Sequence, residues 1–478
     1  MLFNSFIFFF FLGIVLPVFY VLNTKTSKNL WLLFASYFFY GYWDIRFCSL
    51  LVLSTVIDFF IGQAMDREEN PTKRKRLLMV SLFSNLGILA VFKYFNFFID
   101  SFQAVVSQFG GDLDFLHLNI ILPVGISFYT FQTLSYTIDI YRGQLKPTKN
   151  FLDFALFVSF FPQLVAGPIE RASNLLPALS EKLSPSKEQI KQGIILIITG
   201  LFRKVMIGDT SGRYVDTIFG NIEYYSSVEL LFALFMFSIQ IYADFSGYSR
   251  IARGCSKLLG VELMINFEQP YMSRNITEFW RRWHISLSSW LRDYLYIPLG
   301  GNRKGETRTY INNMITMLLG GLWHGASWNF VIWGGLHGIY LAIHKLSLRG
   351  KRIGRENADF SSLPSSLKAI GQMAFTFILV LFTWLFFRST SWEMTTAYFQ
   401  GIIDWRPTEY GGRFLIIALV YAAVVILMDV LEYTQRTHTY LLNMKSVGAI
   451  IGILVGLLLS TFIYMFQADP LPFIYFQF

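Results

Sequence analysis

The 478-residue sequence has few charged side chains and few cysteines. Asp, Glu, Lys and Arg make up 15% of its residues, where a soluble domain carries about 25%. The two cysteines, Cys48 and Cys255, lie far apart and match neither a disulfide framework nor a metal-binding motif. With 54% hydrophobic residues and a mean hydropathy of +0.46, the chain has more apolar surface than a water-soluble core can bury. The shortage of charge therefore predicts a membrane protein.

Long apolar runs occupy much of the chain. Several reach roughly 20 residues, the length that crosses a hydrocarbon core of about 30 Å. Their Phe, Leu and Ile residues do not alternate with polar ones as in a transmembrane β-barrel, so we expect helices. We predict an all-α, polytopic membrane protein with about 11 or more helices, some of them re-entrant. Candidate spans lie near 1–22, 30–48, 49–65, 78–99, 120–141, 188–207, 228–248, 369–388, 413–431 and 447–466.

Three segments differ from simple spans. Segment 151–169 is apolar but contains Pro162 and Pro168, which favours a broken or re-entrant helix. Segment 250–308 is rich in Arg among Trp, Tyr and Gly, and we expect amphipathic and re-entrant helices on the cytoplasmic side there. Because both flanks of 310–344 are basic, this segment should cross the membrane an even number of times or form a deep hairpin.

Basic residues predict the orientation of the chain. Clusters within 67–76, 142–149, 345–355 and 436–445 mark cytoplasmic loops by the positive-inside rule. The loop at 100–118 carries Asp100, Asp112 and Asp114 without Lys or Arg, as an outer loop can. This count places the carboxyl end outside the cytoplasm. Arg203 and Lys204 depart from the rule, because they lie close to the expected outer end of their span.

The net charge of +9 does not predict nucleic-acid binding. The basic residues sit in short loops, where they set orientation and contact anionic membrane lipid.

Histidines are the main candidates for chemistry. Four of the six, His284, His324, His337 and His344, fall within about sixty residues, and ionisable groups inside a membrane are costly and often functional. A neutral histidine can act as a general base at physiological pH. Alternatively, each can simply hydrogen-bond a neighbouring carbonyl. Their spacing matches no zinc motif, so we predict no metal.

Glycines and arginines near these histidines also have two interpretations. The pairs Gly320–Gly321 and Gly334–Gly335 allow either a ligand or another helix to pass close by, and helix packing is the simpler interpretation. Arg281, Arg282 and Arg292 are candidates for binding the phosphates of a nucleotide-bearing donor, or for contacting lipid.

The last nine residues, 470–478, carry no charged side chain, and two prolines prevent a continuing helix. Such a tail either re-enters the protein or joins an interfacial aromatic belt.

Several motifs carry a resemblance to a known family. The run WRRWHISLSSWLRDY at 280–294, followed by YIPLGGN at 296–302 and GGLWHG at 320–325, resembles the signature of bacterial membrane-bound O-acyltransferases. The runs PVGISFYTFQ at 123–132, FFPQLVAGPI at 160–169 and DFSGYS at 244–249 are similar to the same family. In length and in its tyrosine-bearing tail, the chain resembles the branch that O-acetylates alginate and other polysaccharides.

This resemblance implies a fold and roles for particular residues. It implies a single membrane-embedded O-acyltransferase domain over 1–478, with helices around a central tunnel and an aromatic tail from about 467. His324 would be the essential catalytic residue, and His284 would line the same tunnel. A similar tail in the related teichoic-acid D-alanylation system is thought to accept the acyl group on its tyrosine, which would make Tyr475 an acyl relay.

The expected activity is acetyl transfer from cytoplasmic acetyl-CoA across the bacterial plasma (inner) membrane. An extracytoplasmic SGNH-type acetyltransferase partner would complete transfer to the polysaccharide acceptor. Three alternative functions stay open. The protein could be a D-alanyl transferase that uses a carrier protein, a component of a polysaccharide-export transporter, or a structural scaffold for a secretion complex.

Overall fold

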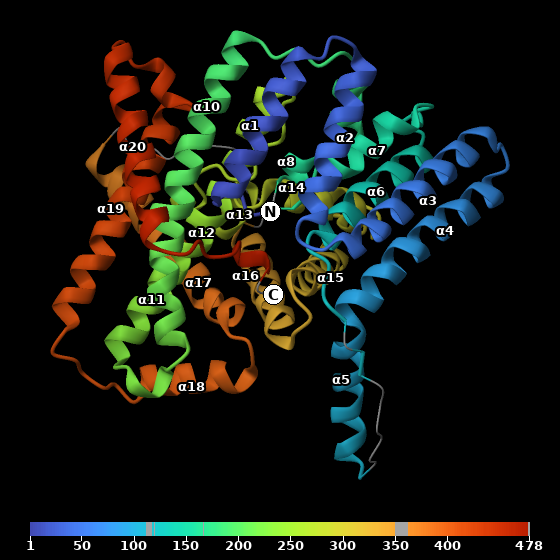
Figure 1. Cartoon of the computed structure of the whole chain (residues 1–478). Helices are drawn as coiled ribbons and strands as arrows, with labels where there is room; N and C mark the ends of the chain where they lie inside the picture. Colours follow the sequence, from blue (N-terminus) through green and yellow to red (C-terminus); the bar gives the residue numbers. More distant parts are fainter. Residues whose placement is uncertain (111–116, 119, 166, 349–361, 477–478) are drawn as a thin grey trace. The chain divides into compact units, whose positions relative to one another are not determined.

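The computed structural model describes residues 1–110, 117–118, 120–165, 167–348 and 362–476. Within these ranges every regular element is a helix (Figure 1). The prediction of an all-α, polytopic membrane protein is confirmed. The backbone divides into two compact units that interleave along the chain, Met1–Ile197 with Arg250–Met264, and Ile198–Ser249 with Ile265–Phe478. The prediction of one domain over 1–478 stays a prediction.

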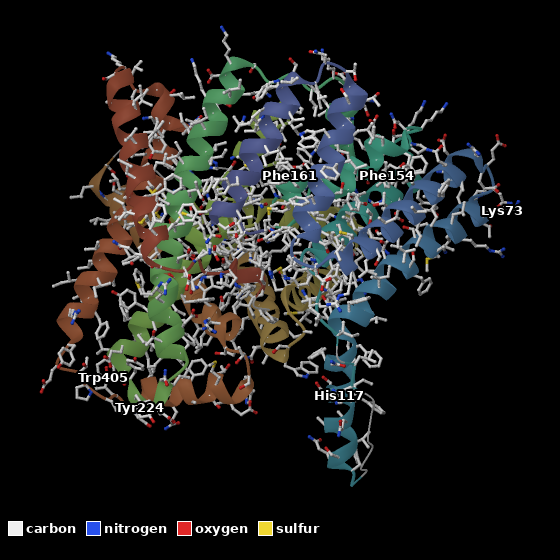
Figure 2. All side chains as sticks on the ribbon, viewed as in Figure 1. Lys73, His117, Phe154, Phe161, Tyr224 and Trp405 are labelled. Atoms are coloured by element: carbon white, nitrogen blue, oxygen red, sulfur yellow. The ribbon has the colours of Figure 1, made fainter. Side chains whose placement is uncertain are left out.

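The first unit contains the amino-terminal helices. They are α1 (Phe6–Val21), α2 (Lys25–Gly41), η1 (Ile45–Phe47), α3 (Cys48–Arg67), α4 (Pro71–Leu89), η2 (Ala90–Tyr94), α5 (Phe95–Gln108), α6 (Ile126–Tyr141), α7 (Phe151–Ser159), α8 (Phe161–Leu164) and α9 (Ala172–Ser180). The helices α10 (Lys187–Leu201) and α12 (Ser227–Leu258) contribute residues to both units. In Figure 2, Phe154 and Phe161 lie among other side chains, whereas Lys73 projects from the start of α4.

Buried polar groups join the helices of the first unit. Asp58 on α3 is fully buried and accepts hydrogen bonds from Ser81 Oγ (2.6 Å) and Asn85 Nδ2 (2.8 Å) on α4. Asp153 on α7 pairs with Lys25 Nζ on α2 at 2.6 Å. Such interhelical hydrogen bonds and ion pairs stabilise helix packing where water is scarce.

The second unit contains the remaining elements. They are η3 (Phe202–Asp209), α11 (Thr210–Phe219), η4 (Ile222–Tyr224), η5 (Pro270–Met272), α13 (Ile276–Arg282), α14 (Ile285–Leu291), η6 (Arg292–Tyr296), α15 (Glu306–His324), α16 (Trp328–Ser347), α17 (Leu363–Arg388), α18 (Trp392–Ile403), α19 (Gly411–Gln435), η7 (Tyr440–Asn443), α20 (Val447–Gln467) and η8 (Ile474–Phe476). Figure 2 labels the exposed aromatic residues Tyr224 and Trp405 of this unit.

The ten expected spans each coincide with a helix, with changed ends. Six helices of the described residues are long and apolar enough to cross a membrane, namely those over Ile45–Arg67, Pro71–Gln108, Ser227–Leu258, Leu363–Arg388, Gly411–Gln435 and Val447–Gln467. The helix over 71–108 is much longer than the expected 78–99, because α4 continues through η2 into α5. Residues 250–258 were expected in a re-entrant region but belong to α12, since nothing in 246–258 breaks its hydrogen-bond ladder.

The predicted break in 151–169 and the predicted hairpin in 310–344 are present, whereas the cytoplasmic, re-entrant placement of segment 250–308 stays a prediction. The chain breaks between α7 and α8 at Phe160, whose backbone leaves the helical region at φ −51° and ψ 108°. Segment 276–291 forms two short helices, α13 and α14, and segment 306–347 forms the hairpin of α15 and α16.

Some predicted features fall outside the described residues. These are Asp112 and Asp114 of the expected outer loop, Ala166 of the FFPQLVAGPI run, the basic residues Arg349, Lys351, Arg352 and Arg355, and the last two positions of the tail.

Candidate active site

The three residues proposed for catalysis come together inside the second unit. The ring of Tyr475 lies 5.5 Å from the ring of His324 and 6.3 Å from the ring of His284, centroid to centroid. The two histidine rings are 6.3 Å apart. His324 ends α15, His284 lies between α13 and α14, and Tyr475 belongs to η8 in the tail. Residues separated by up to 191 positions (284 to 475) thus form one cluster.

Aromatic side chains enclose this cluster. The ring centroid of Phe245 on α12 lies 4.7 Å from that of His284 and 4.8 Å from that of Tyr475. Trp333 on α16 and Phe387 on α17 contact His324 at 5.0 and 5.2 Å. The exposed fraction is 0% for His284 and 3% for His324. A site this enclosed excludes water, which protects a reactive acyl ester from hydrolysis.

The backbone of His284 has an unusual conformation. It adopts the left-handed region, at φ 42° and ψ 56°, which residues other than glycine rarely adopt. Asn266 holds the next two residues, because its backbone oxygen accepts from Ile285 N (3.0 Å) and its Oδ1 accepts from Ser286 Oγ (2.6 Å). Strain of this kind costs about 1–3 kcal/mol and clusters at functional sites. The surrounding contacts therefore fix the direction of the His284 ring.

Three buried polar atoms of His284 and Tyr475 lie at the centre of the cluster. Among the described residues, neither ring nitrogen of His284 nor the hydroxyl of Tyr475 has a hydrogen-bond partner, and all three atoms are buried. The Tyr475 residue as a whole is half-buried, so its hydroxyl points inward. Burial lowers the pKa of His284 to about 3 and raises the pKa of Tyr475 well above 10. Both groups are therefore neutral at physiological pH, and the phenol needs a base before it can attack.

The histidines of α16 have structural roles. Trp280 Nε1 donates to His337 Nδ1 at 3.3 Å, and an indole N–H can only donate. The proton of His337 must therefore sit on Nε2, which lies 3.0 Å from Thr383 Oγ1. His344 Nδ1 similarly lies 2.8 Å from Thr277 Oγ1. Both histidines therefore have hydrogen-bond partners within the protein, but these partners are threonine hydroxyls and an indole and not the expected carbonyls.

The three arginines proposed to bind the donor lie on α13 and η6. Arg282 pairs with Glu278 at 2.8 Å, and Arg292 pairs with Asp293 at 2.7 Å, while Arg281 is exposed. Both ion pairs leave part of each guanidinium exposed, so these residues stay candidates for phosphate contacts.

Two glycines bring the helices of the α15–α16 hairpin into backbone contact. A Cβ atom on Gly321 would lie 2.1 Å from the backbone oxygen of Phe330, and one on Gly334 would lie 2.2 Å from that of Met317. Helix packing therefore explains these glycines, because small residues commonly allow membrane helices to approach closely. Because His324 follows Gly321 by one turn, this contact also sets the position of the catalytic candidate.

We expect Gly321→Ala to destabilise the protein by about 1–3 kcal/mol, the usual cost of overpacking. The added methyl group must push α15 away from α16, which would also displace His324. Thermal unfolding of the purified protein measures the loss of stability. Gly335→Ala is the matched control, since its Cβ would make an ordinary 3.4 Å contact with Leu318. A wild-type melting temperature in Gly321→Ala would contradict this account of the hairpin.

The sequence motifs also contained residues of this site other than the histidines. Phe245 and Asp244 lie in the DFSGYS run, which the sequence offered only as a family resemblance. Asn266 lies in no run that we singled out, because a buried asparagine gives no periodic or spacing signal. The tail re-enters its own unit, with Phe473 at 0% and Ile474 at 1% exposure. Within the described ranges, no three His, Cys, Asp or Glu side chains group as metal ligands would.

Comparison with known proteins identifies the family. The model of the membrane-bound O-acyltransferase family (MBOAT) matches residues 34–392. A probable alginate O-acetylase AlgI of Pseudomonas putida is 39% identical over 423 residues, which cover 87% of this chain and 84% of that protein. A peptidoglycan O-acetyltransferase of Helicobacter pylori is 33% identical, with 100% of this chain and 98% of that protein covered. A teichoic acid D-alanyltransferase of Streptococcus thermophilus is 30% identical over 55% of this chain and 68% of that protein.

The chain therefore belongs to the membrane-bound O-acyltransferase family. The predictions of an acyltransferase and of the O-acetylase branch are confirmed. The D-alanyltransferase match covers about half of the chain, whereas the peptidoglycan O-acetyltransferase match covers all of it, which favours acetyl over D-alanyl transfer.

Proposed function

We propose that this protein takes an acetyl group from cytoplasmic acetyl-CoA and carries it across the plasma membrane for O-acetylation of an extracytoplasmic polysaccharide. The first step makes an ester on Tyr475. His324 accepts the phenolic proton, the phenol oxygen attacks the thioester carbonyl, and the carbon–sulfur bond breaks. The proton then passes from His324 to the leaving thiolate of coenzyme A, which balances the step.

The observation that carries this proposal is the position of Tyr475. Its ring lies against both histidines, and its buried hydroxyl has no protein partner among the described residues. A tyrosine with a purely structural role at such a site would normally hydrogen-bond a neighbour. A relay requires a hydroxyl within reach of a base, in surroundings that keep water from the ester.

The second step passes the acetyl group to the outside. The relatives are named for alginate and for peptidoglycan, so a polysaccharide is the expected final acceptor. An extracytoplasmic SGNH-type acetyltransferase would take the group from Tyr475 and complete the transfer. Arg281, Arg282 and Arg292 would contact the phosphates of the donor at the cytoplasmic side, in a reaction that needs no metal.

Intact mass spectrometry of the purified protein with acetyl-CoA tests the proposal. Wild type should gain one acetyl group within a turnover, and peptide mapping should place it on Tyr475. Tyr475→Phe should gain none, because it keeps the aromatic packing but has no hydroxyl. Tyr224→Phe is the control, since Tyr224 is 78% exposed.

The other outcomes would overturn parts of the proposal. Acetylation that persists in Tyr475→Phe would move the acceptor elsewhere in the enzyme. Acylation only by a D-alanyl carrier protein would replace the donor. Transport of polymer without any acyl turnover would replace the enzyme function with export.

A further inference from the structure

Three buried charges lie beside the tail of the second unit. Lys204 Nζ pairs with Asp209 Oδ1 at 2.6 Å and with Asp244 Oδ1 at 2.8 Å. The exposed fractions of these side chains are 1%, 2% and 3%. Two carboxylates share the ammonium of Lys204 in a dry site, and buried carboxylates are costly unless hydrogen-bond donors approach them. We call this group the tail seat.

The π-helix η3 brings two members of the seat together. Lys204 and Asp209 are five residues apart, and an α-helix would turn their side chains away from each other. A π-helix bonds residue i to i+5, so it places both on one face. Segments of this kind often occur at functional sites.

Close backbone packing supplies the third member. A Cβ atom on Gly208 would lie 3.1 Å from the backbone nitrogen of Asp244, and one on Gly247 would lie 2.8 Å from that of Lys204. The absence of side chains at both glycines therefore lets α12 approach η3 closely enough for Asp244 to reach Lys204.

The tail binds to this seat through its backbone. Ile474 N donates to Asp244 Oδ2 at 2.8 Å, and Lys204 Nζ donates to the backbone oxygen of Pro472 at 3.4 Å. Between them, the ring of Phe473 stacks on Tyr248 at 4.6 Å. The tail thus supplies a backbone donor to the buried carboxylate of Asp244, and Ile474 directly precedes Tyr475.

We infer that Asp244 and Lys204, supported by Asp209, are positioning residues that hold the tail so that the ring of Tyr475 lies against both His284 and His324. This inference rests on the proposed relay through Tyr475. The seat acts through the backbone on either side of Phe473, so it fixes where the phenol points without contacting the reacting atoms.

The first test is Asp244→Asn, which keeps the shape of the side chain but cannot both accept from Ile474 N–H and pair with Lys204 as a carboxylate does. Hydrogen–deuterium exchange of the peptide containing 470–476 should become faster than in wild type. The maximal rate of Tyr475 acetylation should fall roughly 10- to 100-fold, the cost of a small misplacement of reacting groups. The acetyl-CoA concentration at half-maximal rate should stay unchanged, because donor binding is not touched. A merely structural role would not produce this separation.

Asp469→Asn is the matched control, since it makes the same substitution on an exposed residue just before the tail. It should leave exchange and acetylation at wild-type values.

A second variant reaches the same hydrogen bond from the tail and keeps the buried charges intact. Ile474→Pro removes the N–H donor at the first residue of η8, a position that tolerates proline in helices, and it also replaces the buried isoleucine side chain. It should reproduce the slower acetylation of Asp244→Asn, whereas Ile474→Val, which keeps the N–H, reports the contribution of the side chain. Wild-type exchange and rate in both Asp244→Asn and Ile474→Pro would overturn the seat.

The two readouts separate the seat from the relay. If these variants speed up exchange of the tail but Tyr475 is never acetylated in wild type, the seat stands and the relay fails. If Tyr475 is acetylated at the same rate in every variant, the relay stands and the seat fails.

Discussion

Replacing His324 with alanine is expected to lower the rate of Tyr475 acetylation about 100- to 10,000-fold, the usual contribution of a general base. The phenol cannot ionise by itself, because burial raises its pKa well above 10. His324 has the histidine ring closest to that of Tyr475, at 5.5 Å compared with 6.3 Å for His284. Without the imidazole of His324, the nearest remaining imidazole is that of His284, whose ring lies farther from Tyr475 at 6.3 Å. The initial rate of acetyl incorporation, measured by intact mass, checks the prediction.

His344→Ala is the matched control for this variant. His344 also lies on the α15–α16 hairpin, but its Nδ1 lies 2.8 Å from Thr277 Oγ1. It should acetylate Tyr475 at close to the wild-type rate. An unchanged rate in His324→Ala would remove His324 from the mechanism and leave His284 as the base.

The sequence predicted the helices because hydrophobic length is a local property. Each of the ten expected spans lies on a helix, since a run such as 447–466 has no stable conformation in lipid other than a helix. Helix ends were less accurate. The continuation of α12 to Leu258 passes through Arg250, Arg253 and Lys257, whose charges suggested a change of structure at 250. Their side chains are buried at 4–6% exposure, so they do not mark the end of the helix.

The candidate site needed more than local pattern. Spacing along the chain did not distinguish the four histidines from one another. Only their contacts separate His337, which has hydrogen-bond partners at both ring nitrogens, from His284. The family resemblance supplied the roles of His324 and Tyr475. Neither pattern nor resemblance indicated Asn266 or the link from Asp244 to Ile474, because side-chain to backbone hydrogen bonds between distant segments leave no trace in the order of residues.

Arg203 and Lys204, which depart from the positive-inside rule, are buried within the protein. The positive-inside rule applies to basic residues that face water or lipid headgroups. Both side chains are 1% exposed and paired with carboxylates of the second unit. Their positive charges are neutralised within the protein, so they carry no information about orientation.

The buried ion pairs of Arg203 predict a large effect of its replacement on stability. Arg203→Met is expected to destabilise the protein by about 3–5 kcal/mol, the cost of leaving buried charges without a partner. Its guanidinium lies 2.9 Å from Asp429 and 3.0 Å from Glu432, which are 4% and 0% exposed. Tyr242 and Gln269 also donate to these carboxylates, but neutral donors cannot balance two negative charges. Thermal unfolding in detergent measures the loss.

Two further variants separate charge from packing in this cluster. Arg388→Met removes a similar ion pair whose Asp216 partner is 40% exposed, and exposed pairs of this kind contribute about 0–1 kcal/mol. Adding Asp429→Asn and Glu432→Gln to Arg203→Met removes every formal charge of the cluster while leaving oxygens that accept from Tyr242 and Gln269. The triple variant should therefore be more stable than Arg203→Met alone, because the single variant suffers from unpaired charge and not from lost volume. Equal melting temperatures for the single and triple variants would show instead that Arg203 stabilises the unit through the packing of its long side chain.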